Sequence, residues 1–496
     1  MRSMMKTAIL SLIAIFVIVP TALADNSVSR IDGGSRYAVA ANVAKEGWGT
    51  ASTVVLVGKT AYADATAGIP LAYQKNGPVL FTNSTDLSYD TKKALTSLKT
   101  KTVIVLGSTS SVSNNVVNQI KKMGISTQRI SGKNRYELSA NIAKKMKTPA
   151  GVVVVDGSFY AHGIAIAPVA AQKGFPILYT DDKGLRSEIA SVAKASNVKQ
   201  TIVVGGENYV TKSAYNQLKS PTRIKGSSRY DVAANIVKKY NMSTNNTYVS
   251  RGFGYATSSS AAGIAAKQNK ALLLTNEQTL PIVTRETISS KNITKFTVVG
   301  STNTVTPTVV SQLKNPVVGK RIFIDPGHGA HDSGAVGYGL YEKNLNLDVA
   351  KRLNSKLSNA GALTTMSRTS DTFDTLQQRV SKGAAAKADI FISVHANSND
   401  NSSASGTETY YDQTFAAVNS LKLARNIQPK MISALGTRDR GVKTAGFYVI
   451  KFSRMPSVLL ETGFVSSPVD SNILKSATYK DRLAAGISSG VSGYFR

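Results

Sequence analysis

The chain has 496 residues, of which 42% are hydrophobic and 18% charged, so it is long enough for three or four domains and is too apolar for a disordered protein. It contains no cysteine, which excludes disulfide bonds, cysteine nucleophiles and thiolate zinc sites. Its formal net charge of +31 points to an anionic partner, and no nucleic-acid-binding motif accompanies that charge.

The first 24 residues are predicted to form a signal peptide that is removed on export. Arg2 and Lys6 form a positively charged start, and an apolar run over residues 7–19 follows. Ala22-Leu23-Ala24 fits the small-x-small pattern of a cleavage site before Asp25. The apolar run is too short for a comfortable membrane span, and no later stretch reaches about 18 apolar residues. We therefore expect a secreted chain without a membrane span, with an uncleaved N-terminal anchor as the alternative.

Three copies of one sequence pattern follow. Each copy opens on an Arg-Ile-x-Gly-x-x-Arg-Tyr motif, which begins at Arg30, Arg129 and Arg223. An apolar i,i+4 pair after each motif predicts a helix, and β-branched runs such as STVVLVG in the first copy predict buried strands. Strands that alternate with amphipathic helices indicate α/β modules with a largely buried sheet. The modules are assigned to residues 25–120, 121–215 and 216–316.

The repeated pattern resembles the type 2 cell-wall-binding repeat, which occurs in tandem threes on surface proteins of Gram-positive bacteria. The resemblance covers about residues 28–315 and implies three modules that pack together and bind anionic cell-wall polymers without a covalent link. The second arginine of each motif could contact such a polymer or could hold a loop by hydrogen bonds to carbonyl groups. The tyrosine beside it could belong to the core or could stack on sugars. The positions are Arg36, Arg135 and Arg229 for the arginine and Tyr37, Tyr136 and Tyr230 for the tyrosine.

No repeat contains a convincing cluster of titratable side chains. His162 occurs in the second copy alone and is interpreted as a polar filler of the core. Binding rather than chemistry is therefore assigned to the three repeats.

A pattern without a repeat partner begins after Asn315-Pro316, and residues 320–496 are assigned to a separate α/β domain. Apolar spacing predicts a helix that opens near Glu342 and stops at Gly361. Further helices are predicted near 376–387, 416–435 and 470–493, and strands at 321–325, 363–368, 389–397, 406–411, 446–450 and 457–464. The expected fold is a mostly parallel or mixed sheet flanked by helices.

Polar side chains with metal-ligating chemistry gather at the ends of these strands. His328 follows the first strand, His395 ends the strand at 389–397, and Glu342 can fold back from the start of its helix toward both. Two histidines and one carboxylate leave zinc an open position, which is the pattern of a catalytic site. Glu461 lies in an apolar strand, where a carboxylate is costly to bury unless it binds a ligand or acts in catalysis.

Four segments of this domain resemble motifs of the zinc-dependent N-acetylmuramoyl-L-alanine amidases of the third type. They are DPGHG at 325–329, EKN at 342–344, SVHAN at 393–397 and LLETGF at 459–464. The resemblance covers about residues 320–495 and implies that His328, Glu342 and His395 bind Zn²⁺ while Glu461 is the catalytic carboxylate. His331 stands at a variable position of the family motif and is left out of the metal set. Asn397 could hold substrate or organise the loop.

The implied activity is hydrolysis of the amide between N-acetylmuramic acid and the L-alanine of the peptidoglycan stem peptide. The repeats would hold the enzyme on the wall of a Gram-positive bacterium. A zinc peptidase that cuts within the stem peptide and a wall-binding surface protein without enzymatic activity are the alternatives. A glycosidase would use a pair of carboxylates without a metal, which fits the two histidines poorly.

Overall fold

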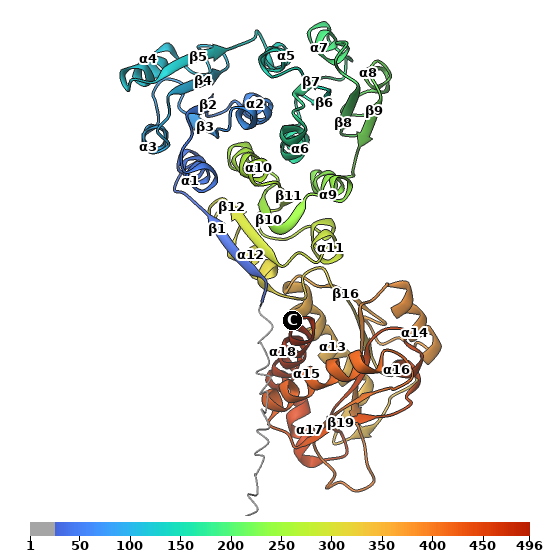
Figure 1. The fold of residues 1–496 in the computed structure, drawn as a ribbon. Helices are drawn as coiled ribbons and strands as arrows, with labels where there is room; N and C mark the ends of the chain where they lie inside the picture. Colours follow the sequence, from blue (N-terminus) through green and yellow to red (C-terminus); the bar gives the residue numbers. More distant parts are fainter. Residues whose placement is uncertain (1–24) are drawn as a thin grey trace, which may run out of the picture.

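The computed structural model describes residues 25–496, so the predicted signal peptide lies outside the described residues. The three repeats form one body and the C-terminal domain forms a second (Figure 1). Among the described helices, none combines the length and the apolar character that a membrane span requires.

Each repeat builds most of a four-stranded parallel sheet. The first sheet has the order β3 (Val79–Thr82), β2 (Thr53–Gly58), β4 (Thr102–Leu106) and β5 (Ser126–Ile130). The second has the order β7 (Ile177–Thr180), β6 (Gly151–Asp156), β8 (Gln200–Val204) and β9 (Pro221–Ile224). The third has the order β11 (Lys270–Thr275), β10 (Ser243–Arg251), β12 (Lys295–Val299) and β1 (Ser27–Ile31). The predicted α/β class is confirmed.

The last strand of every sheet comes from the start of a different repeat. β5 and β9 open the second and third repeats and complete the preceding sheets, whereas β1 opens the first repeat and pairs with β12 of the third. Ser27 lies opposite Lys295 in that pairing, so the two ends of the repeat region close a ring. The proposed boundaries at residues 120 and 215 thus divide sequence repeats, and the sheets extend across them.

The first arginine of each motif binds its own strand (β1, β5 or β9) to the sheet that this strand completes. Arg30 donates hydrogen bonds to the carbonyls of Gly300 and Val305, in the loop after β12. The other two arginines make the equivalent pairs, Arg129 with Gly107 and Val112 and Arg223 with Gly205 and Val210. Charge-assisted hydrogen bonds to carbonyls stabilise loops that would otherwise leave these acceptors unpaired.

Three alanine-rich helices pack against one another at the centre of the repeat body (Figure 1). They are α2 (Tyr62–Gln74), α6 (Tyr160–Lys173) and α10 (Tyr255–Gln268). Their first residues meet, with the ring centroids of Tyr62 and Tyr160 5.3 Å apart and those of Tyr62 and Tyr255 5.5 Å apart. Small side chains allow this close approach, and the tyrosine rings fill the space where the helices converge.

The second arginines of the three motifs lie around this tyrosine cluster. Arg36 donates to the carbonyl of Lys59, Arg135 to that of Gly157 and Arg229 to that of Gly252. Each also lies over the ring of a central tyrosine from another repeat, namely Tyr255, Tyr62 and Tyr160 in turn. Hydrogen bonding to carbonyls, one of the two predicted roles, is therefore what the described contacts provide. The neighbouring tyrosines Tyr37, Tyr136 and Tyr230 pack against the core.

Shorter helices complete the repeats. The helix predicted after each motif is present as α1 (Arg36–Trp48), α5 (Arg135–Lys145) and α9 (Arg229–Tyr240). The outer helices are α3 (Tyr89–Ser97), α4 (Asn114–Lys122), α7 (Ser187–Ala193), α8 (Lys212–Asn216), α11 (Ile282–Ser290) and α12 (Pro307–Lys314). His162 on α6 is 2% exposed and packs between Phe159 and Tyr209, as expected for a filler of the core.

The C-terminal domain has a six-stranded mixed sheet in which only the pair β18 and β20 is antiparallel. Its order is β16 (Leu363–Met366), β13 (Arg321–Pro326), β17 (Ile390–Asn397), β20 (Ser457–Phe464), β18 (Thr407–Tyr411) and β19 (Asp439–Thr444). A hairpin of β14 (Val336–Gly337) and β15 (Leu340–Tyr341) precedes the first helix.

Helices cover both faces of this sheet. One face packs on α13 (Glu342–Asn359), α15 (Ala417–Leu435) and α18 (Ala477–Phe495), with α17 (Pro468–Lys475) beside α18. The opposite face carries α14 (Leu376–Ala385) and α16 (Tyr448–Phe452), which cover Phe323 and Phe391. Because side chains alternate along a strand, Ile322 and Ile324 face the first layer while Phe323 faces the second.

Two sequence expectations for this domain are wrong. The run GFYVI at 446–450 was expected to be a strand but contains the start of α16, and Val449 and Ile450 pack on the sheet face. Periodicity does not separate a buried strand from a short buried helix in so short a run. The helix expected at 470–493 is two helices, α17 and α18, which meet at Ser476. The edge strand β19 was not anticipated.

The two bodies are in direct contact. Val318 packs in the core of the repeats, and its neighbour Val317 packs in the core of the C-terminal domain. Arg285 of α11 donates a hydrogen bond of 2.8 Å to the carbonyl of Ala362 beside β16. The connection is therefore packed on both sides.

The closure of the ring by β1 can be tested with Ser29→Pro. The N–H of Ser27 donates to Thr294, and N–H groups alternate in direction along a strand, so the N–H of Ser29 also faces β12. Proline there removes that donor and the hydroxyl contact with Thr297, with an expected cost of about 2 kcal/mol. The melting temperature of the repeats should fall by several degrees.

Val28→Pro is the matched control, because the N–H of Val28 faces away from β12 and proline is tolerated on the free side of an edge strand. Its effect on the melting temperature should be smaller. Equal effects of the two substitutions would contradict the pairing of β1 with β12.

Candidate metal centre

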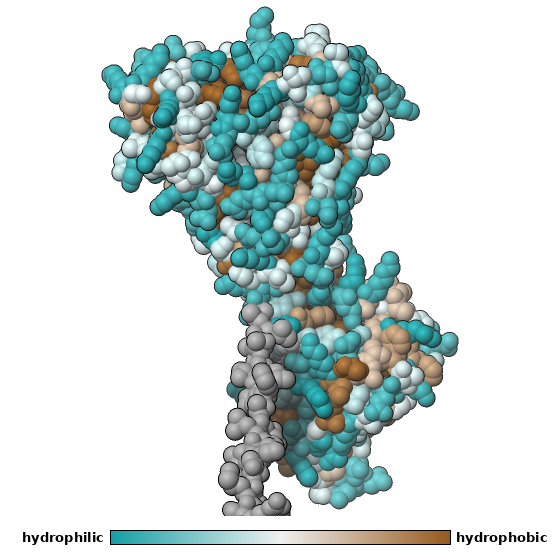
Figure 2. All heavy atoms as spheres, viewed as in Figure 1, coloured by the Kyte–Doolittle hydropathy of each residue, from teal (hydrophilic) through white to brown (hydrophobic). Residues whose placement is uncertain are grey.

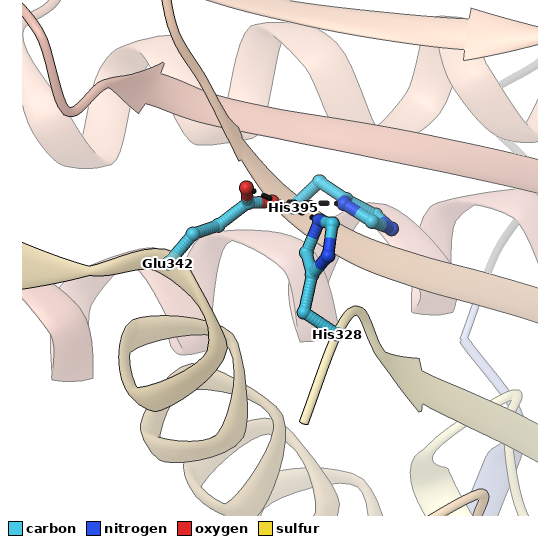
Figure 3. A group of neighbouring side chains, drawn as sticks. All are labelled: His328, Glu342 and His395. Carbon is cyan, nitrogen blue, oxygen red and sulfur yellow. Dashed lines mark hydrogen bonds and ion pairs between the residues drawn. The ribbon is translucent and has the colours of Figure 1, made fainter. Parts of the chain in front are cut away.

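Three side chains from different elements converge at the C-terminal ends of strands β13 and β17 in the C-terminal sheet. His328 lies in the loop after β13, Glu342 is the first residue of α13 and His395 lies near the end of β17 (Figure 3). One ligand atom of each lies within 4.8 Å of the others. The structure thus brings together all three residues that the sequence proposed as metal ligands.

Two glycines make this convergence possible. A Cβ atom on Gly327 would lie 2.2 Å from Cε1 of His395, and one on Gly334 would lie 2.5 Å from Oε2 of Glu342. Contacts this short would displace the functional side chains. The glycine-rich loop therefore provides the space in which the imidazoles and the carboxylate approach each other.

Glu342 is the centre of the group. It is 4% exposed, and its carboxylate lies 2.9 Å from Nδ1 of His395 and 3.2 Å from Nε2 of His328. Backbone N–H groups of Ala335 and Ala396 also donate to it, at 2.8 and 3.1 Å. Burial alone would raise the pKa of Glu342, but the hydrogen bonds and charges of the two histidines hold it well below its usual range. The carboxylate is therefore the ionised form that a cation requires.

His328 is oriented by Asp332, a residue that the sequence did not single out. Nδ1 of His328 lies 2.8 Å from Oδ2 of Asp332, which leaves Nε2 directed at Glu342. Burial opposes protonation of His328, but its hydrogen bonds to Glu342 and Asp332 raise its pKa above the usual value. A carboxylate on the far nitrogen of a ligating histidine fixes its tautomer and ring orientation. Proximity in the loop was the only sequence signal for Asp332.

Two buried arginines hold the loop that presents His328. His328 has a φ of 61°, which is a costly conformation for a residue other than glycine. Arg379 donates to the carbonyl of His328 at 3.0 Å and pairs with Asp325 at 3.1 Å. Arg368 donates to the carbonyl of Gly327 at 2.8 Å. These bonds stabilise the loop in its left-handed conformation.

Glu461 lies beside the group on β20. Its register partner on β17 is His395, so both side chains project from the same face of the sheet. Oε2 of Glu461 is buried and has no hydrogen-bond partner among residues 25–496. Burial raises the pKa of Glu461 to about 7. An unpartnered carboxyl group with this pKa has the properties of a proton-transfer group.

The two polar residues whose roles the sequence left open lie outside the three-residue group. The ring of His331 packs on Phe373, with centroids 4.4 Å apart. Asn397 donates a hydrogen bond of 2.9 Å to Glu408 on β18.

A cavity of about 270 Å³ opens at the two histidines and is also lined by Phe373, Leu376 and Val449. Exposed apolar side chains continue from it over α14 and α16, where Figure 2 shows a light to dark brown area on the C-terminal domain. A larger cavity of about 600 Å³ lies at the junction with the repeats and contains none of the site residues.

Comparison with known proteins agrees with this division of the chain. The sequence model of the family described as N-acetylmuramoyl-L-alanine amidase matches residues 322–493. The model described as cell wall binding domain 2 matches residues 30–117, 129–215 and 223–310.

Similarity to individual proteins covers both bodies. The chain is 52% identical over 496 residues, the full length of both proteins, to the N-acetylmuramoyl-L-alanine amidase LytC of Bacillus subtilis. The structure of Cwp6 from Clostridium difficile is similar with a TM-score of 0.57 and 24% identity, over 94% of this chain and 79% of that one, which bears on the fold alone. Cwp8 from Clostridium difficile has a TM-score of 0.54 and 30% identity, over 58% of this chain and 51% of that one.

The fold, the repeats and these matches define a peptidoglycan hydrolase that is associated with the cell wall. Within that class, the chain belongs to the N-acetylmuramoyl-L-alanine amidases that carry three wall-binding repeats. The resemblances found in the sequence are thereby confirmed, and so is the expected amidase activity.

Gly327→Ala tests the packing of the site. The added Cβ would displace the ring of His395, so peptidoglycan hydrolysis should fall at least tenfold while the circular dichroism spectrum stays unchanged. Gly446→Ala is the control, because its nearest new contact is 3.9 Å away at Lys451. Equal activity of the two variants would show that His395 does not need its observed position.

Proposed function

We propose that the chain is a zinc-dependent amidase that is secreted to the cell wall, in which His328, Glu342 and His395 hold one Zn²⁺ ion and Glu461 is the catalytic carboxylate. The donor set suits this ion, because zinc accepts imidazole nitrogen and carboxylate oxygen at about 2.0–2.2 Å. Ligand atoms within 4.8 Å of one another can meet around such an ion after small side-chain movements. Three protein ligands leave a position open for chemistry.

The observation that carries the proposal is the unpartnered Oε2 of Glu461 beside this donor set. A buried oxygen without a partner is costly, and catalysis is a common reason for keeping one. When bound, Zn²⁺ would increase the acidity of a water molecule and polarise the carbonyl group of the scissile amide.

The residues of the chain would then transfer the proton and keep the ligands in position. Glu461 takes the proton of the attacking water and delivers it to the nitrogen of L-alanine, which leaves as an amine. Burial raises the pKa of Glu461, which brings its protonated and ionised forms closer in free energy near neutral pH and suits proton transfer in both directions. Asp332 keeps Nε2 of His328 directed into the site, and the arginines behind the loop keep His328 in place.

The products distinguish this reaction from the alternatives. An amidase releases stem peptides with a free amino group on L-alanine and leaves the glycan strand intact. A zinc peptidase would cut between residues of the stem, and a protein that only binds the wall would release nothing. The family to which the chain belongs favours the first of these.

We also infer that the repeats bind anionic cell-wall polymers. Residues 25–319 contain 36 Lys and Arg against 15 Asp and Glu, an excess of 21 positive charges. Figure 2 shows hydrophilic side chains over most of the visible face of this body. A basic surface of this kind attracts polyanions, and attachment of the repeats to the wall raises the local concentration of the amidase domain at its substrate.

The first test compares Glu461→Gln with His395→Ala in the full mature chain. Glu461→Gln should lose hydrolysis by a factor of at least 10² and keep one zinc per chain, because it removes only the proton-transfer group. His395→Ala should lose both hydrolysis and zinc, because it removes a ligand. Zinc content is measured by elemental mass spectrometry, and products are identified by peptide mass spectrometry.

His331→Ala is the matched control, since this histidine lies beside the site but outside the donor group. It should retain zinc and activity. Retained hydrolysis in Glu461→Gln, or retained zinc in His395→Ala, would contradict the assigned roles. Products that are cut within the stem peptide would change the assigned activity from amidase to peptidase.

The second test measures binding of the Glu461→Gln chain to purified walls at increasing ionic strength. Binding should weaken steeply with salt and should drop when the anionic polymers have been extracted from the walls, because screening reduces long-range attraction. Walls treated identically but with the polymers retained serve as the control. Binding that is indifferent to both treatments would contradict recognition of a polyanion.

A further inference from the structure

A row of ionisable side chains continues from the site across the sheet. His395 on β17, Glu461 on β20 and Glu408 on β18 are neighbours in register. Residues in register project from the same face, which here is the face covered by α14 and α16. The row therefore leads from the candidate metal centre toward the edge strand β19.

Glu408 is a buried carboxylate whose hydrogen bonds are fully satisfied. It is 1% exposed, and its Oε1 accepts hydrogen bonds of 2.9 Å from both Asn397 and Tyr410. Its Oε2 accepts from Arg440 at 2.8 Å and from Lys443, both on β19. The buried charge is thus stabilised by four donors, two of which are cations.

The two cations are in contact with solvent. The side chain of Arg440 is 28% exposed and that of Lys443 is 38% exposed, whereas the side chain of Glu408 is 2% exposed. Nε of Arg440 donates to Glu408 and Nη1 donates to the carbonyl of Ser405 at 3.5 Å, which leaves Nη2 without a partner among residues 25–496. The guanidinium lies over the ring of Phe464. Glu408 carries one negative charge against two positive charges, so the group of Glu408, Arg440 and Lys443 has a net charge of +1.

We propose that Arg440 and Lys443, held in place by Glu408, bind a carboxylate of the stem peptide on the β19 side of Glu461. This inference rests on the proposed function, because it requires the scissile amide to lie at Glu461. An immobilised guanidinium with free N–H groups and a neighbouring ammonium are the usual partners of a substrate carboxylate.

The distances agree with a carboxylate close to the cleaved bond. Neighbouring strands are about 4.8 Å apart, so β19 lies about 10 Å from β20. The side chains of Arg440 and Lys443 reach back to Glu408 on β18 and shorten that distance. An extended peptide spans about 3.3–3.6 Å per residue, so the acidic residue next to L-alanine falls within reach.

The same contacts could instead serve only to fasten the edge strand β19 to the sheet. The two roles differ in their dependence on the charge of the substrate. A fastening role affects all substrates equally, whereas a binding role affects only those that carry the carboxylate.

The test uses the zinc-loaded mature chain and two soluble peptidoglycan fragments. The fragments differ only in whether the glutamate next to L-alanine carries a free carboxylate or a carboxamide. The wild-type enzyme should cleave the carboxylate form with a KM at least fivefold lower. Arg440→Gln and Lys443→Gln should each reduce that preference severalfold by raising KM for the carboxylate form, with little change in kcat.

Arg425→Gln and Lys475→Gln are the controls, because both residues are exposed on helices of the same domain. They should keep the wild-type preference. A wild-type enzyme that cleaves both fragments equally would overturn this inference and leave the proposed function unaffected. Variants that lose activity equally on both fragments would have the same consequence. A zinc-loaded wild-type chain that cleaves neither fragment, nor whole peptidoglycan, would overturn the proposed function and this inference with it.

Discussion

The buried carboxylate of Glu342 imposes the constraint on which the C-terminal domain depends. A charge in this position is tolerable only when several groups compensate it, and the structure supplies two imidazoles and two backbone N–H groups. Those groups come from the segment after β13 and from the end of β17, while the carboxylate itself belongs to the start of α13, so this contact fixes how three elements meet. Gly327 and Gly334 leave the necessary room, and Arg368 and Arg379 stabilise the loop from behind.

The three repeats form one body because they exchange strands. Each module gives its first strand to a neighbouring sheet, and β1 closes the ring by pairing with β12. The central helices can pack closely because they are rich in alanine. The packed junction at Val317 and Val318 then joins this body to the amidase domain.

Much of this arrangement could be predicted from the sequence, because local patterns carried it. β-branched runs marked the buried strands, and His328, Glu342, His395 and Glu461 stood in motifs that a known family shares. Features that depend on long-range pairing were not predictable. The exchange of β1 joins positions at opposite ends of the repeat region. Asp332 and Glu408 were missed for the same reason, since their importance comes from what they contact in space. The run at 446–450 is too short for its periodicity to separate a buried strand from a short buried helix.

We propose that the group of His328, Glu342 and His395 is a zinc site next to the unpartnered carboxylate of Glu461. Anomalous diffraction from crystals of the mature chain, recorded on both sides of the zinc absorption edge, tests it most directly. One strong peak is expected between Nε2 of His328, the carboxylate of Glu342 and the ring of His395, with Glu461 nearby but not coordinated. A peak elsewhere, a site ligated by Glu461 or His331, or no peak in crystals grown with zinc would contradict it.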